Sequence, residues 1–232
     1  MNHIYQYGVF SALMQGFSSD GATVSDVLSR CNHGLGTVCG LNGEIVIVDG
    51  EAYHFTPDNQ LHRLAPTDHL PMIVATDFQP TLTKPLDTLR MDTLQEALHP
   101  FFPANQNNFI AVRVDATFKK IVYRIGGPQI RPREPLLELS KRQVVKTYDN
   151  VAGTLFGFYS PPYTNGICVA GFHLHFLSSD RQAGGHVLEF EAENVELKAA
   201  VNTHVHLELP ASEEFNQELM QPDLAKDLHL AE

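Results

Sequence analysis

The distribution of apolar and polar residues predicts short β-strands along most of the chain. Glu44–Val48 and Glu51–Phe55 flank Asp49-Gly50, a dipeptide typical of the two-residue turn of a β-hairpin. Two further apolar stretches, Phe109–Asp115 and Lys119–Ile125, predict a second hairpin that ends at the glycines and proline of 126–128. Beyond residue 150 the pattern is mostly that of strands, which we expect at Thr154–Tyr159, Gly166–Leu177, His186–Glu193 and Val195–Leu209.

Several short helices are predicted between the strands. Thr23 and Asp26 have the spacing of an N-terminal cap, as have Thr93 and Glu96. The expected helices are Phe10–Phe17, Thr23–Arg30, Thr93–Leu98, Ser212–Met220 and a tail, Asp223–Leu230. The fold class is therefore α+β. A change in composition near residues 140–150 divides the chain into halves 1–146 and 147–232, and because no flexible linker separates them we expect one compact unit.

Composition argues against several classes of function. The 16 lysines and arginines against 27 aspartates and glutamates give a net charge of −11, which argues against nucleic acid and against an anionic membrane surface as partners. No apolar run has the roughly 18–20 residues of a membrane-spanning helix. The three cysteines do not make a disulfide framework, and the residues before Arg30 lack the basic region of a secretory signal. We therefore expect a soluble cytoplasmic protein with free thiols.

Three of the 12 histidines have the pattern of a metal site. On a strand, His173 and His175 point to the same face. Turn residues follow at 178–185, and strand alternation resumes at His186. If the two strands pair about the middle of that turn, His186 lies opposite His173, with Cβ atoms about 4.5–5.5 Å apart. Three imidazoles would then converge and leave an open coordination position, as in a catalytic zinc site.

The sequence pattern alone does not assign a catalytic or binding role to the other polar candidates. His204 and His206 form a second His-x-His pattern without a third histidine on a partner strand, and we interpret them as surface residues. Glu44 lies at the edge of an otherwise buried strand. Arg113 and Arg124 each interrupt an apolar strand, where an arginine faces solvent, pairs with an acid or binds a carboxylate in a site. The pattern alone does not choose between the two arginines.

At these residues the chain resembles the α-acetolactate decarboxylase family. The similarity extends over nearly the whole chain and is densest at 150–154, 157–161 and 171–188. The run His-Leu-His-Phe-Leu-Ser-x-Asp-Arg-x-x-Gly-Gly-His-Val-Leu at 173–188 is far more specific than a lone His-x-His pattern. The resemblance implies a mixed-sheet half and a barrel-like β half with a few short helices, and a homodimer.

The resemblance also implies a zinc enzyme. The family's three histidine ligands carry over to His173, His175 and His186, and its site arginine falls on Arg124, which favours Arg124 over Arg113. The substrate would be a small 2-hydroxy-3-keto acid, (S)-2-acetolactate, which loses CO2 to give (R)-acetoin. Zinc would stabilise the enediolate as a Lewis acid, and Arg124 would neutralise the substrate carboxylate.

Three further residues are implied in the site. Leu-x-Gly-Glu at 41–44 identifies Glu44 as an active-site carboxylate, and Thr37 matches a family residue near the substrate. A carboxylate from the family's carboxyl tail falls on Glu232. Glu44, with Glu232, would deliver the proton that fixes the stereochemistry of the product. The chain departs from the family pattern at 125–127 and at Phe172, where tyrosine is common.

The residues leave two other classes open. A cupin-like metal oxygenase or isomerase also uses His-x-His and a later histidine, but it normally has a glutamate a few residues after the first two, and residues 176–179 contain none. In the second class, the histidines hold a structural or adventitious metal in a small-molecule binding module. Acetoin production from acetolactate distinguishes an enzyme from such a module.

Overall fold

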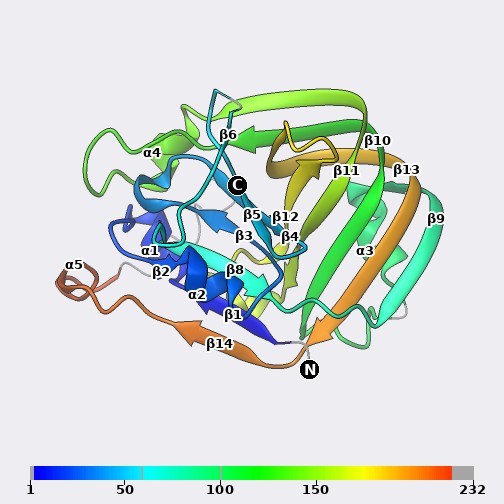
Figure 1. Ribbon diagram of the computed structural model, residues 1–232. Helices are drawn as coiled ribbons and strands as arrows, with labels where there is room; N and C mark the ends of the chain where they lie inside the picture. The colour runs from blue at the N-terminus through cyan, green and yellow to red at the C-terminus, as the bar shows by residue number, and fades with distance from the viewer. Residues whose placement is uncertain (1–2, 59, 100, 221–232) are drawn as a thin grey trace.

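Two β-sheets packed against each other make up most of the protein, with a few short helices around them (Figure 1). The computed structural model describes residues 3–58, 60–99 and 101–220. This is an α+β fold with a mixed sheet and a partly closed second sheet, as predicted. The predicted tail helix, Asp223–Leu230, lies outside the described residues.

The first sheet has seven strands in the order β14-β1-β8-β3-β4-β5-β6. Strand β14 pairs in parallel with β1, and the other neighbours are antiparallel, so the sheet is mixed. Strands from near both ends of the described chain therefore lie side by side at one edge of this sheet (Figure 1). The strands are β1 (Ile4–Tyr7), β3 (His33–Thr37), β4 (Glu44–Val48), β5 (Glu51–Phe55), β6 (Leu61–His62), β8 (Met72–Thr76) and β14 (Val205–Glu208).

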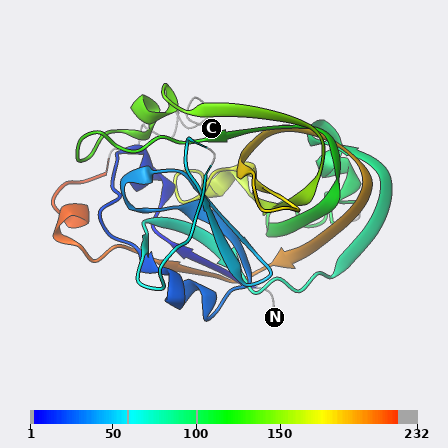
Figure 2. The same cartoon turned by 45° about the horizontal axis from the view of Figure 1, so that its top comes forward.

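The second sheet has five strands in the order β10-β11-β12-β13-β9, and β13 also pairs with β10. This additional pairing joins four of the strands into a ring, and Figure 2 shows them curling around a common axis. The barrel-like part predicted from the family resemblance is therefore confirmed. The strands are β9 (Leu82–Arg90), β10 (Phe109–Ile125), β11 (Val144–Ser160), β12 (Gly171–Ser178) and β13 (Gly184–Asn202).

The helices are short and connect or cover the sheets. Ser212 caps the last helix by accepting a hydrogen bond from the Phe215 amide, as predicted, but that helix ends at Asn216 rather than at Met220. Leu219, in the following segment, is 95% exposed, so no packing extends the helix. The α-helices are α1 (Phe10–Met14), α2 (Val24–Leu28), α3 (Leu94–Ala97), α4 (Leu136–Ser140) and α5 (Glu213–Asn216). Two short strands outside the main sheets, β2 (Ala22–Thr23) and β7 (His69–Leu70), pair with each other.

Among the described residues, none of the helices combines the length and the apolar character needed to cross a membrane.

The hairpin predicted around Asp49-Gly50 is confirmed. Strands β4 and β5 pair with Val48 opposite Glu51, and both turn residues have positive φ (54° and 81°). Such a turn needs φ above zero at both central positions, which Asp-Gly tolerates well. The two turn residues alone were therefore sufficient to predict this hairpin.

The second predicted hairpin is wrong, because Phe109–Ile125 is one continuous strand, β10. Residues 116–118 do not form a turn. The β10–β13 register is irregular on either side of Thr117, and the strand continues through the stretch where the alternation of apolar and polar residues is interrupted. The sequence pattern also predicts that the chain leaves one strand and starts another at Asn194. Instead β13 continues through Asn194, which has a positive φ (53°). β-Bulges of this kind bend a strand without ending it, which suits a sheet that closes on itself.

The core explains why β4 is an uninterrupted apolar run. Val46 and Val48 pack into the main core, which contains side chains of both sheets, whereas Ile45 and Ile47 pack into a smaller core on the other face of the first sheet. Because both faces of β4 are buried, polar residues are restricted to its ends. Glu44 is its first residue and lies where the two sheets meet.

A polar network around the buried His33 also joins the two sheets. His33 on β3 is 4% exposed; its Nε2 lies 2.8 Å from Nη1 of Arg113 on β10, and its Nδ1 lies 2.7 Å from Oδ1 of Asn32. Arg113 also forms ion pairs with Asp49 (2.6 Å) and Asp115 (2.9 Å). Arg113 is therefore engaged in a contact between the sheets.

Stability should depend on pH through His33. Burial and, to a lesser degree, the Arg113 charge lower the pKa of His33 from 6.5 to about 4. The unfolded chain takes up a proton at this histidine below about pH 6.5, whereas the folded chain does not until about pH 4, so stability is lost as the pH falls between these values. We expect His33→Phe to remove about 2 kcal/mol from the difference in unfolding free energy between pH 7 and pH 4.5.

Urea denaturation of the wild type and of His33→Phe at both pH values measures this difference. His204→Phe is the control, because it makes the same replacement at an exposed histidine. An equal pH dependence in His33→Phe and the wild type would contradict the assignment.

Candidate active site around three histidines

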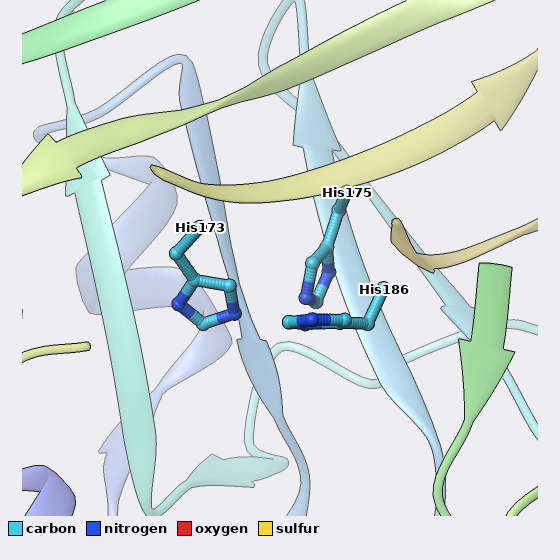
Figure 3. A group of neighbouring side chains, drawn as sticks. All are labelled: His173, His175 and His186. Atoms are coloured by element: carbon cyan, nitrogen blue, oxygen red, sulfur yellow. The ribbon is translucent and has the colours of Figure 1, made fainter. Parts of the chain in front are cut away.

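Three histidines from two neighbouring strands face one another (Figure 3). His173 and His175 come from β12, and His186 comes from β13. Each offers a ring nitrogen within 4.8 Å of those of the other two, and the ring centroids are 4.9, 5.3 and 5.5 Å apart. The convergence predicted from the sequence is confirmed. It is the one group of this kind among the residues that the structure describes.

The register of the two strands differs from the prediction. His186 pairs with His175, not with His173. The turn is displaced because the Ser178 hydroxyl accepts hydrogen bonds from the amides of Gln182 and Ala183. The displacement amounts to two residues, and side chains alternate with a period of two, so all three histidines stay on the same face.

Hydrogen bonding orients one of the rings. Nδ1 of His175 lies 2.7 Å from the Ile45 carbonyl oxygen on β4, so Nδ1 carries the proton and donates it. Nε2 of His175 is buried and has no hydrogen-bond partner among the described residues. Its lone pair is therefore available to a metal ion, and the donated proton corresponds to the usual outer contact of a metal-binding histidine.

All three histidines are held neutral. Burial lowers the pKa of His175 to about 3, with the Arg124 charge adding to the effect and the bond to Ile45 opposing it. Burial also holds the pKa of His173 and His186 well below the usual value, and Arg124 and the neighbouring histidines contribute. Neutral imidazoles are the form that binds metal ions. The donor set and the bare Nε2 of His175 thus fit a divalent metal ion.

Arg124 lies directly beside the histidines. On β10 it pairs across the sheet with His186 of β13, which in turn pairs with His175 of β12. These three side chains form a row across adjacent strands, and Arg124 is only 6% exposed. A buried guanidinium at this position can bind the carboxylate of a small ligand through its planar fork.

Glu44 and Thr37 approach the same place from the first sheet. Oε2 of Glu44 lies 3.6 Å from Nε2 of His175, and Oε1 accepts a hydrogen bond of 3.2 Å from the Gly126 amide. The Thr37 hydroxyl donates to the Gly43 carbonyl oxygen at 2.8 Å. The sequence departure at 125–127 therefore includes a residue that orients Glu44. Glu232, the other predicted carboxylate, lies outside the described residues.

One pocket contains these residues, and most of its remaining wall is apolar. Thr37, Glu44, Arg124 and the three histidines all line it. The apolar wall, which the sequence did not reveal, includes Phe10 and Leu13 of α1, Met72 and Val74 of β8, and Leu136 and Leu139 of α4. Gln143, just after α4, is a polar lining residue that the sequence also did not reveal. These residues come from separate segments, so no local pattern joins them.

The remaining polar candidates lie elsewhere. His204 and His206 are exposed, and His206 stacks on the ring of Tyr5 at 5.7 Å. The interpretation of this second His-x-His pattern as a surface feature is confirmed. Arg113 binds Asp49 and Asp115 and does not line the pocket.

The fold and the site define an α+β protein with a buried candidate metal centre in a small pocket that also holds a cation and a carboxylate. The model of the alpha-acetolactate decarboxylase family matches residues 4–222. The chain belongs to the alpha-acetolactate decarboxylase family, whose members are carboxy-lyases.

Individual relatives agree with this assignment. The alpha-acetolactate decarboxylase of Bacillus subtilis is 32% identical over 100% of this chain and 91% of its own, and that of Brevibacillus brevis is 34% identical over 100% of this chain and 81% of its own. A crystal structure of the Bacillus subtilis protein superimposes with a TM-score of 0.94 over 99% of each chain. The fold and the sequence thus indicate the same family.

Proposed function

We propose that this protein decarboxylates acetolactate to acetoin and CO2 with a divalent metal ion, zinc, bound by His173, His175 and His186. The observation that carries the proposal is the convergence of three neutral histidines beside Arg124 and Glu44 in a pocket of a chain of this family. An ion bound there supplies Lewis-acid chemistry toward the substrate's oxygen atoms.

Arg124 binds and neutralises the substrate carboxylate. Its place beside His186 puts this positive charge next to the histidines and away from bulk water. Departure of CO2 leaves an electron pair on C2, which the adjacent ketone takes up as an enediolate. Because the ketone accepts this electron pair, the reaction needs no thiamine or pyridoxal cofactor. The buried guanidinium also favours the negative charge that develops.

Glu44 delivers the proton that replaces CO2. The Gly126 amide fixes one carboxylate oxygen, so the other approaches the substrate from a defined side. Delivery from one side yields one enantiomer, (R)-acetoin from (S)-2-acetolactate. Thr37 contributes to substrate binding, and Glu232 assists Glu44. The cytoplasmic location expected from the composition and the homodimer implied by the family resemblance stay predictions.

Removal and return of the metal test this function. Acetoin formed from acetolactate is measured with a colour reaction for native protein, for protein treated with a chelator, and for chelated protein to which zinc is returned. We expect activity, its loss and its restoration, in that order. A binding module with an incidental metal would form no acetoin in any sample. Full turnover by metal-free protein would contradict the role of the metal.

A further inference from the structure

Gln143 lines the pocket and has a buried side-chain atom without a hydrogen-bond partner among the described residues. It lies between the end of α4 and the start of β11, and it lines the pocket together with Arg124 and the three histidines. The side-chain amide oxygen, Oε1, is buried and has no hydrogen-bond partner among the described residues. Burying an acceptor without a donor is unfavourable, so such an atom needs an explanation.

Strand pairing places Gln143 on the side of the pocket where Glu44 is held. Arg124 pairs with Val145, and Ile125 pairs with Val144. Continuing this register by one residue puts Gln143 opposite Gly126, whose amide donates to Glu44. Gln143 therefore lies at the end of the pocket where the Gly126 amide holds the Glu44 carboxylate.

Contacts of the preceding residue restrain the chain next to Gln143. The preceding residue, Arg142, contacts both carboxylate oxygens of Glu134 at 2.9 Å and the Pro128 carbonyl oxygen at 3.3 Å. Glu134 is 3% exposed, so this ion pair is anchored in the protein. A restrained backbone reduces the entropy lost when the side chain binds a ligand.

The substrate in the proposed function offers one matching group. The carboxylate and the ketone of acetolactate can only accept hydrogen bonds, so its 2-hydroxyl group is its sole donor. We propose that Oε1 of Gln143 accepts a hydrogen bond from the 2-hydroxyl group and thereby selects 2-hydroxy acids over their deoxy analogues. This inference rests on the proposed function. A site with a buried acceptor rejects a ligand without the hydroxyl, because the acceptor then stays unsatisfied.

Two unreactive ligands isolate this contact. In 2-hydroxy-2,3-dimethylbutanoate an isopropyl group replaces the acetyl group, so no ketone is present to accept the electron pair of decarboxylation, and the 2-hydroxyl is again the only donor. The second ligand, 2,3-dimethylbutanoate, lacks that hydroxyl. Their dissociation constants are measured by calorimetry on zinc-loaded wild type and Gln143→Leu. We expect the preference for the hydroxy acid to be about tenfold smaller in Gln143→Leu, because one hydrogen bond is lost. For acetolactate, KM should rise by a similar factor with little change in kcat.

Two more variants distinguish the acceptor from other effects. Gln143→Glu keeps an acceptor but no donor, so it should keep the hydroxyl preference while binding both anions more weakly. Lys141→Gln, an exposed change beside the same helix end, should match the wild type in every measurement. Thermal unfolding verifies that each variant is folded.

The outcomes separate this inference from the function on which it rests. Absence of acetoin formation by wild-type holoenzyme would refute the proposed function itself. An active wild type whose hydroxyl preference is unchanged in Gln143→Leu would refute the role of Gln143 alone. Loss of the preference in Gln143→Glu as well would assign the contact to the amide nitrogen and overturn the acceptor role.

Discussion

Replacing His175 with asparagine should abolish acetoin formation and reduce metal affinity by at least about 100-fold, more than the loss typical of an outer contact. The asparagine amide nitrogen can take the place of Nδ1 and keep the hydrogen bond to the Ile45 carbonyl oxygen. The variant thus removes Nε2, the ring nitrogen that has no hydrogen-bond partner among the described residues, with little disturbance of the strand contact.

Metal content per chain after dialysis, together with the acetoin assay, measures the effect. His204→Asn is the matched control, since it changes one histidine of the exposed His-x-His pattern. We expect its metal content and turnover to equal those of the wild type. If His175→Asn retained stoichiometric metal and normal turnover, the metal site would have to be sought elsewhere.

Replacing Glu44 with glutamine should lower kcat by about 10²–10⁴-fold, the usual contribution of a positioned proton donor. Glutamine has the same shape and can still accept the hydrogen bond from the Gly126 amide through its oxygen. It lacks the acidic proton, so protonation would then come from water. KM should change little, because Arg124 and the histidines remain.

The stereochemistry of the product provides a second measurement for this variant. Protonation from water is less directed, so chiral chromatography should show acetoin closer to a racemate. Glu51→Gln is the control, because Glu51 begins the partner strand β5 and is exposed. An unchanged kcat and an unchanged enantiomer ratio in Glu44→Gln would remove Glu44 from the mechanism.

The sequence predicted features that depend on local geometry. The Asp49-Gly50 hairpin follows from the φ preferences of two residues, and the histidine group follows from the alternation of side chains along a strand. The predicted register differs from the observed one by two residues, but the prediction that the three histidines share a face is still correct, because the alternation has a period of two. A displacement of one residue would have turned His186 to the opposite face.

Features that depend on distant partners were not predictable from local patterns. The continuity of β10 depends on its pairing with β11 and β13, which supply hydrogen bonds through the irregular stretch around Thr117. The pattern did not separate Arg124 from Arg113, because each interrupts an apolar strand; the family resemblance favoured Arg124. In the folded chain Arg124 lies beside His186, whereas Arg113 binds Asp49. Gln143 was overlooked since nothing in its neighbours along the chain places it in a pocket.

The hydrogen bond from His175 to the Ile45 carbonyl oxygen crosses from one sheet to the other, and the pocket lies along the same seam. Neither sheet alone contains a complete binding site, so a ligand that needs both can bind only after they have docked. Occupancy and folding are thereby thermodynamically linked, and a bound metal or substrate would stabilise the docked arrangement by an amount that grows with the logarithm of its free concentration relative to its dissociation constant.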